Sequence, residues 1–107
     1  MLKALKKMFI KKDQNTLSKE ELLKAYLVDV RTTAEFDEGN VVGSTCIPLN
    51  KIEQNLAKFK GKDTIVLFCK SGNRSEQAKN ILERHGIKNV HNAGGWEKVQ
   101  KALDNDE

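Results

Sequence analysis

The stretch CKSGNRS, residues 69–75, decides how this chain is organised. It follows the apolar run TIVLF at 64–68, which is too short for a helix and rich in β-branched and aromatic residues. Such a run predicts a buried strand. After the stretch, Ala78 and Leu82 recur at helical spacing, which predicts a helix over 76–84. A cysteine therefore ends a strand, and a short loop leads from it into a helix.

The loop has the residue types of an anion-binding turn around a reactive cysteine. Gly72 and Asn73 tolerate the dihedral angles that turn backbone N–H groups inward, beside the positive end of the helix dipole. Arg74 adds a fixed positive charge, and Lys70 adds a mobile one. We expect this field to lower the pKa of Cys69 and to favour the nucleophilic thiolate. The competing interpretation, a buried inert cysteine, leaves the Gly, Asn, Arg and Ser that follow it unexplained.

Composition indicates one globular domain of 107 residues, because hydrophobic residues make up 38% of the chain and charged residues 32%. The net charge of +4 comes mostly from scattered lysines. We interpret these lysines as a solvated surface, with attraction of small anions as the alternative. No basic run is interleaved with aromatic residues, so we expect no nucleic-acid partner.

The cysteines indicate a reducing compartment. Cys46 and Cys69 form no disulfide framework, and we find neither a membrane-spanning apolar stretch nor a signal-peptide pattern. We therefore expect a cytoplasmic protein in which Cys69 stays reduced. His85 and His91 lie at no ligand spacing from either cysteine, so we predict no metal, and no cofactor-binding motif is present.

The chain divides into an N-terminal amphipathic extension at 1–16, a domain at 17–104 and an acidic tail at 105–107. Apolar residues recur at helical spacing among lysines in 1–12, a pattern that permits contact with a membrane or a partner. We favour the alternative, a short helix packed on the domain or a frayed tail.

Within the domain, short strands alternate with short helices. We expect strands at 26–30, 44–47, 64–68 and 87–92, with a fifth edge strand near Leu17. We expect helices at 18–24, 33–37, 50–61, 76–84 and after a tight turn at 93–96. The alternation predicts an α/β fold, with a central parallel sheet of four to five strands and helices on both faces.

Two further positions carry alternatives. Asp29 lies near the carboxyl end of a predicted strand, with Arg31 close behind it. They form either part of a site or a structural ion pair. Cys46 is interpreted as a small core residue, and the alternative is a second thiol that resolves an oxidised Cys69.

The pattern resembles the single-domain rhodanese family. The resemblance lies in LVDVR at 27–31, EF at 35–36, GNVVG at 39–43, IP at 47–48, the loop Cys69-x-x-Gly72-x-Arg74-Ser75 and GGW at 94–96. It covers 17–104 and implies a rhodanese fold with thiosulfate sulfurtransferase activity. By this resemblance, Cys69 is the catalytic sulfur acceptor. The substrate-binding loop consists of Lys70, Ser71, Gly72, Asn73, Arg74 and Ser75. Asp29 and Arg31 match a pair of residues at a strand end of the family, whose role is to support the site rather than to react.

The resemblance also implies the partners. The donor is a small anionic sulfur compound such as thiosulfate, and the acceptor is cyanide in vitro or a thiol in cells. A protein persulfide is a further candidate partner. Asn40, Ser44 and Cys46 depart from the residues usual in the family, where His, Ala and Asn respectively are common. These departures affect local hydrogen bonding rather than the reacting group.

Two other functions compete with sulfur transfer. The first is a cysteine phosphatase or arsenate reductase, which resembles Cys-x5-Arg, whereas four residues separate Cys69 from Arg74 here. Phe68 also stands where such phosphatases commonly have His. The second is a non-catalytic rhodanese-like binding or regulatory module. Modules of that kind often lack the cysteine, so the presence of Cys69 and Arg74 favours catalysis.

Overall fold

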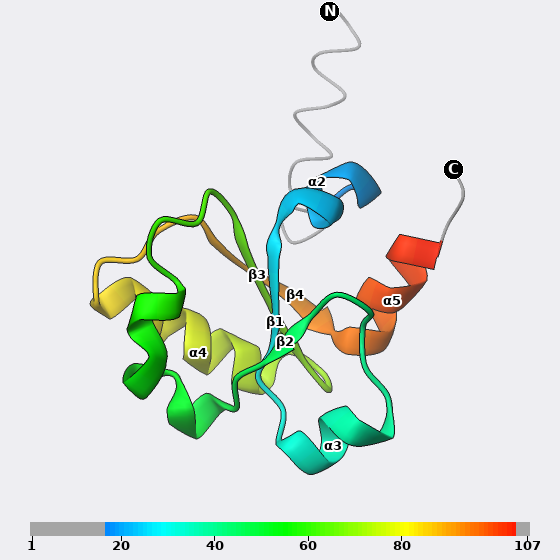
Figure 1. The fold of residues 1–107 in the computed structure, drawn as a ribbon, viewed down its shortest axis with the longest axis horizontal. Helices are drawn as coiled ribbons and strands as arrows, with labels where there is room; N and C mark the ends of the chain where they lie inside the picture. The colour runs from blue at the N-terminus through cyan, green and yellow to red at the C-terminus, as the bar shows by residue number, and fades with distance from the viewer. Residues whose placement is uncertain (1–16, 105–107) are drawn as a thin grey trace, which may run out of the picture.

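Parallel strands and short helices alternate along the chain, as the computed structural model shows (Figure 1). It describes residues 17–104, so the extension at 1–16 and the tail at 105–107 lie outside the described residues. The elements are α2 (Lys19–Lys24), β1 (Tyr26–Asp29), α3 (Thr33–Glu38), β2 (Thr45–Cys46), the 3-10 helices η1 (Leu49–Lys51) and η2 (Glu53–Lys58), β3 (Ile65–Cys69), α4 (Asn73–Arg84), β4 (Val90–Gly95) and α5 (Trp96–Asp104).

The sheet places Asp29 and Cys69, two of the predicted site residues, at the carboxyl ends of neighbouring strands. Within residues 17–104 it has four strands in the order β2-β1-β3-β4, and every neighbouring pair is parallel. Strand β3 is central and all its residues are buried, as its apolar run predicts. Asp29 lies opposite Phe68 on one side and Cys46 on the other, so the carboxyl ends of β1 and β3 place Asp29 and Cys69 close together.

Helices cover both faces of the sheet, as predicted for an α/β fold (Figure 1). Alternate residues of each strand point to opposite faces. Val28 and Leu67 pack with residues of α4 and the two 3-10 helices, whereas Leu27 and Val66 pack with residues of α2 and α5. The first of these clusters includes both Cys69, at the end of β3, and Ala78 of α4, so it fixes the two elements that the loop joins.

The capped helix predicted over 50–61 is wrong. The segment forms two 3-10 helices instead, and neither has a side-chain cap. Asn55 has non-helical backbone angles, φ −122° and ψ 27°, and its Nδ2 donates to the Lys51 carbonyl at 2.9 Å. A short polar side chain that bonds to nearby backbone competes with the regular helix, which explains the interruption.

Two predictions about the edges of the domain are also wrong. Leu17 does not form an edge strand; it precedes Ser18, whose side chain caps α2, and it packs on the cluster of that face. The predicted turn at 93–96 instead continues β4 to Gly95, which pairs with Cys69. A side chain at Gly95 would place its Cβ 2.7 Å from the Lys70 carbonyl oxygen, so only glycine permits this close pairing.

Candidate active site

The loop after β3 turns a backbone amide toward the sulfur of Cys69. Strand β3 ends at Cys69 and α4 begins at Asn73, three residues earlier than predicted. Gly72 has φ 106°, a left-handed angle that favours glycine, and its N–H donates to Cys69 Sγ at 3.0 Å. The predicted inward turn of the loop is therefore confirmed at Gly72.

A second polar contact reaches the sulfur from the first turn of α4. Ser75 is fully buried, and its Oγ lies 3.5 Å from Cys69 Sγ. The hydroxyl also lies 2.6 Å from Asn92 Oδ1 and 3.1 Å from the Gly72 carbonyl oxygen. A hydroxyl has one proton to donate, so Ser75 can give it to the thiolate only by turning away from these oxygens.

Asn92 of β4 holds the loop in place, and its role was not predicted from the sequence. Its Nδ2 donates to the Gly72 carbonyl at 3.0 Å, and its Oδ1 accepts from the Gly94 N–H at 2.9 Å. With the contact to Ser75, one amide side chain joins the loop, α4 and the end of β4. A polar residue within a predicted strand is the only sequence signal for this role.

The surroundings of Cys69 favour its thiolate. Burial by itself raises the pKa of the thiol, but hydrogen bonds from Ser75, Gly72 and Ser71 outweigh it, so the net pKa of Cys69 is lowered. Only 1% of the residue surface is exposed. The thiol of Cys69 is therefore almost fully enclosed at the end of β3.

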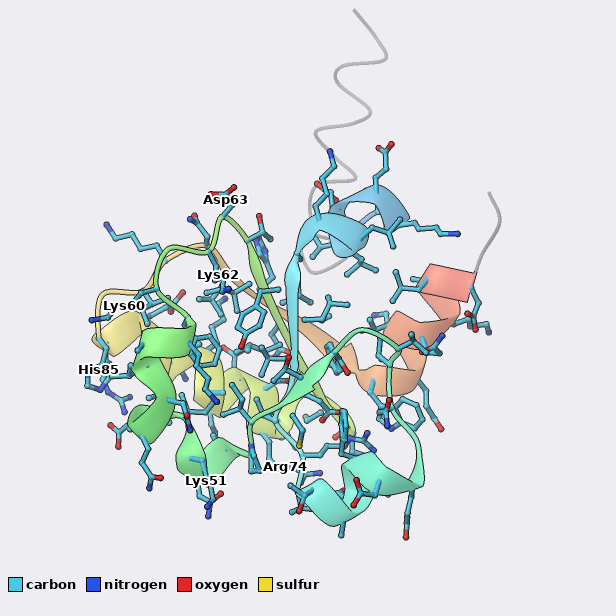
Figure 2. The ribbon with its side chains drawn as sticks, in the orientation of Figure 1. Lys51, Lys60, Lys62, Asp63, Arg74 and His85 are labelled. Atoms are coloured by element: carbon cyan, nitrogen blue, oxygen red, sulfur yellow. The ribbon has the colours of Figure 1, made fainter. Side chains whose placement is uncertain are left out.

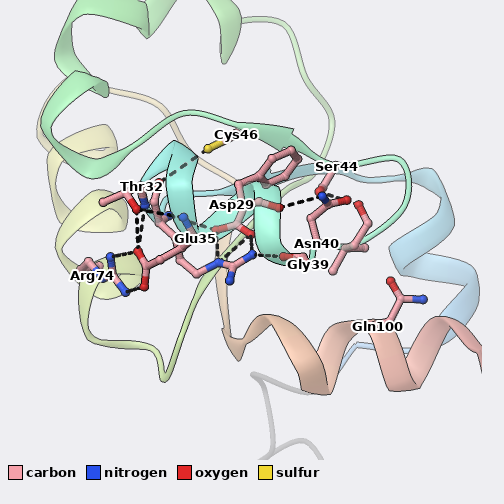
Figure 3. Close-up of polar contacts among 12 residues, drawn as sticks. Asp29, Thr32, Glu35, Gly39, Asn40, Ser44, Cys46, Arg74 and Gln100 are labelled. Carbon is pink, nitrogen blue, oxygen red and sulfur yellow. Dashed lines mark hydrogen bonds and ion pairs between the residues drawn. The ribbon is translucent and has the colours of Figure 1, made fainter.

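Arg74 is paired with a carboxylate of α3 (Figure 3). Its Nη1 and Nη2 donate to the two oxygens of Glu35 at 2.7 and 3.0 Å, a bidentate ion pair. Glu35 also accepts from Thr32, completing the capping box of α3. Hydrogen bonding to Arg74 is the main cause that lowers the pKa of Glu35 to about 2. The predicted positive charge of Arg74 is thus balanced by Glu35, a pairing that was not predicted from the sequence.

This ion pair predicts a specific pH dependence of stability. The pKa of Glu35 falls from its ordinary value of 4.5 to about 2 in the folded protein. The stabilisation is therefore complete above pH 4.5 and is lost as the pH falls toward 2. Relative to Glu35→Gln, we expect the native protein to be more stable at neutral pH by up to about 1 kcal/mol, and this difference should shrink in acid. Urea unfolding at several pH values measures it.

Arg74→Gln is the matched control for the acid measurement, because it removes the partner and leaves the glutamate. It should lose most of the pH-dependent part that Glu35→Gln loses, because only the hydrogen bonds from Thr32 then remain to lower the pKa of Glu35. A constant difference between native protein and Glu35→Gln across this pH range would contradict the role of the pair.

Asp29 and Arg31 form the buried ion pair that was one of the two interpretations of their sequence positions. Asp29 is fully buried and Arg31 is 4% exposed. The carboxylate accepts from Nε and Nη2 of Arg31, and Nη2 also donates to the Gly39 carbonyl at 2.7 Å (Figure 3). The guanidinium carbon lies 4.6 Å from the centroid of the Trp96 ring. The pair thus ties the end of β1 to α3 and to α5.

Cys46 lies too far from Cys69 to act as its resolving thiol. Cys46 on β2 lies opposite Asp29, which lies opposite Phe68, so two strand spacings separate Cys46 from β3. Their Cα atoms are therefore about 10 Å apart, beyond the distance that a disulfide spans. Burial is the main cause that raises the pKa of Cys46, and its Sγ donates to the Arg31 carbonyl at 3.6 Å. The interpretation as a packing residue agrees with this position.

Among residues 17–104, one cavity adjoins the loop after β3 and another lies elsewhere on the domain. The first, of about 230 Å³, adjoins the loop and is lined by Arg31, Glu35, Glu38, Gly39, Lys70, Trp96 and Glu97. The second, of about 260 Å³, includes Lys60, Lys62 and His85, which lie away from Arg74 (Figure 2). Across residues 17–104, none of the helices has the length and apolarity to span a bilayer.

The chain is similar to known proteins over most of its length. The family model of the rhodanese-like domain matches residues 3–102. "Thiosulfate sulfurtransferase PspE" of Escherichia coli is 34% identical over 74 residues, covering 67% of this chain and 71% of that protein. A solved structure of "rhodanese with anions from E. coli" has a TM-score of 0.63 and 33% identity, covering 68% of this chain and 88% of that chain. The human single-domain sulfurtransferase TSTD1 has a TM-score of 0.66 and 27% identity, covering 81% of this chain and 96% of that chain.

Proposed function

Because the chain belongs to the rhodanese-like domain family, we propose that it transfers a sulfane sulfur through a persulfide on Cys69. The observation that carries this proposal is the pair of contacts at the sulfur, the Gly72 N–H that donates to it at 3.0 Å and the Ser75 hydroxyl at 3.5 Å. They favour a thiolate at the end of β3, and a thiolate is the attacking form of cysteine. Relatives named as sulfurtransferases support the same reaction class.

In the first step, the Cys69 thiolate attacks the outer sulfur of thiosulfate. A new S–S bond forms on Cys69, the S–S bond of thiosulfate breaks, and sulfite leaves with the electron pair. Negative charge develops on the leaving group, and the backbone N–H groups that face the sulfur, those of Ser71, Gly72 and Ser75, stabilise it together with the dipole of α4. Arg74 contributes less net charge than an unpaired arginine would, because Glu35 balances it.

In the second step, an acceptor nucleophile attacks the outer sulfur of the persulfide and the Cys69 thiolate leaves. Cyanide yields thiocyanate in this way, and a thiolate yields the acceptor persulfide. The two half-reactions share one covalent intermediate, so the kinetics are ping-pong. We propose the cytoplasm as the compartment, because its reducing poise keeps Cys69 available.

Intact-mass measurement tests the proposal. After brief exposure to thiosulfate, the protein should gain the mass of one sulfur atom, peptide mapping should place the sulfur on Cys69, and cyanide should remove it as thiocyanate. A phosphate-ester substrate incubated in parallel should show no turnover. A protein that gains no sulfur from thiosulfate or from a low-molecular-weight persulfide would contradict the assignment.

A further inference from the structure

The pocket of about 230 Å³ is joined to the Cys69 loop at two points. Lys70, which lines the pocket, is the first residue of the loop after Cys69. Glu35 lines it as well and holds Arg74, in the first turn of the helix that follows the loop. A molecule in this pocket therefore lies against the residue that follows Cys69 and against the carboxylate that holds Arg74.

Arg31 gives the pocket a fixed hydrogen-bond donor. Its side chain is 5% exposed, and its Nε and Nη2 donate to Asp29 and to the Gly39 carbonyl. Among residues 17–104, Nη1 has no hydrogen-bond partner, and Arg31 lines the pocket. The guanidinium carbon lies over the Trp96 ring, 4.6 Å from its centroid, and this contact further restricts the side chain. A preorganised guanidinium nitrogen with exposed Lys70 nearby suits a carboxylate.

Negatively charged side chains line the same pocket. Glu38 of α3 and Glu97 of α5 are lining residues with side chains open to solvent, whereas Glu35 is already paired with Arg74. Asp29 balances the charge of Arg31, so a ligand with only negative charge would meet the carboxylates of Glu38 and Glu97. A ligand with an ammonium and a carboxylate matches both sets of groups.

We propose that this pocket binds the amino-acid head of a small thiol that accepts the sulfur from Cys69. The carboxylate of the acceptor lies on Arg31 and Lys70, and its ammonium lies toward Glu38 and Glu97. The acceptor thiolate attacks the outer persulfide sulfur, the S–S bond to Cys69 breaks, and the electron pair returns to Cys69 as thiolate. This inference rests on the proposed function and names the acceptor class for that site. The cavity volume suits a small head group rather than a large ligand.

A series of thiols tests the match of charges. Protein loaded with sulfur by thiosulfate is mixed separately with four thiols. Cysteine has both an ammonium and a carboxylate, and cysteamine has only the ammonium. N-acetylcysteine has only the carboxylate, and 2-mercaptoethanol has neither group. The second-order rate of sulfur loss, divided by the thiolate fraction of each acceptor, should be about tenfold higher for cysteine than for 2-mercaptoethanol. The two singly charged thiols should fall between them.

Two double variants locate the effect. Glu38→Gln with Glu97→Gln should lower the rates for cysteine and cysteamine about three- to fivefold and leave the rate for 2-mercaptoethanol within about twofold. The rate for N-acetylcysteine should not fall, because the variant removes carboxylates that repel it. The control, Asp63→Asn with Glu83→Gln, removes the same charge from exposed residues that do not line the pocket and should leave the series unchanged. Asp63 lies at the end of the domain away from Arg74 (Figure 2).

The outcomes separate the inference from the function on which it rests. A protein that loads with sulfur but transfers it to all four thiols at similar rates overturns the acceptor site only. Equal changes of the series in both double variants overturn the acceptor site as well, because the effect would then come from net charge. A protein that takes up no sulfur overturns the sulfurtransferase and the acceptor site together.

Discussion

Cys69→Ser is expected to abolish sulfur loading and to leave the fold intact. Serine has nearly the same shape, so the buried position beside Gly72 and Ser75 can accept it. A serine hydroxyl stays protonated at neutral pH and forms no persulfide, so the mass gain after thiosulfate should fall to background. Intact-mass spectra and circular dichroism of the native protein and the variant measure both expectations.

Cys46→Ser is the matched control for this loss, because it removes the other cysteine of the chain. It should load with sulfur as the native protein does, since Cys46 lies two strand spacings from β3 and the pKa of its thiol is raised. Loading that persists in Cys69→Ser and disappears in Cys46→Ser would move the chemistry to β2.

Asp29→Asn is expected to destabilise the domain by about 3–5 kcal/mol, because it leaves the buried guanidinium of Arg31 without a counter-charge. For a domain of this size, such a loss is a large part of the total free energy of unfolding. Urea unfolding measures the change, and the midpoint should fall while the slope stays constant.

The double variant Asp29→Leu with Arg31→Met is the control for the charge effect. It removes both buried charges and keeps apolar volume, so it should recover most of the stability that Asp29→Asn loses. If Asp29→Asn costs less than about 1 kcal/mol, the pair behaves like an exposed ion pair and does not anchor the end of β1.

Short stretches of the sequence predicted several individual strands and helices correctly. The apolar run before Cys69 predicted the buried strand β3, and the helix starts expected at 18 and 33 lie within one residue of the starts of α2 and α3. The helix predicted over 50–61 was wrong because the Asn55 side chain bonds to the nearby Lys51 carbonyl and competes with regular helical hydrogen bonds. The spacing of apolar residues gives no sign of such a bond.

The sequence alone determined that a cysteine ends a buried strand, that the chain turns at Gly72 and that the fold is of the parallel α/β class, because each depends on residue type and short spacing along the chain. Only the tertiary structure decided which charges meet: Glu35 pairs with Arg74 across 39 positions, and Asn92 reaches Ser75 across 17. Strand register sets these contacts and the close approach of Gly95 to Lys70. Register results from packing the whole sheet between its two layers of helices, so no local stretch of sequence encodes it.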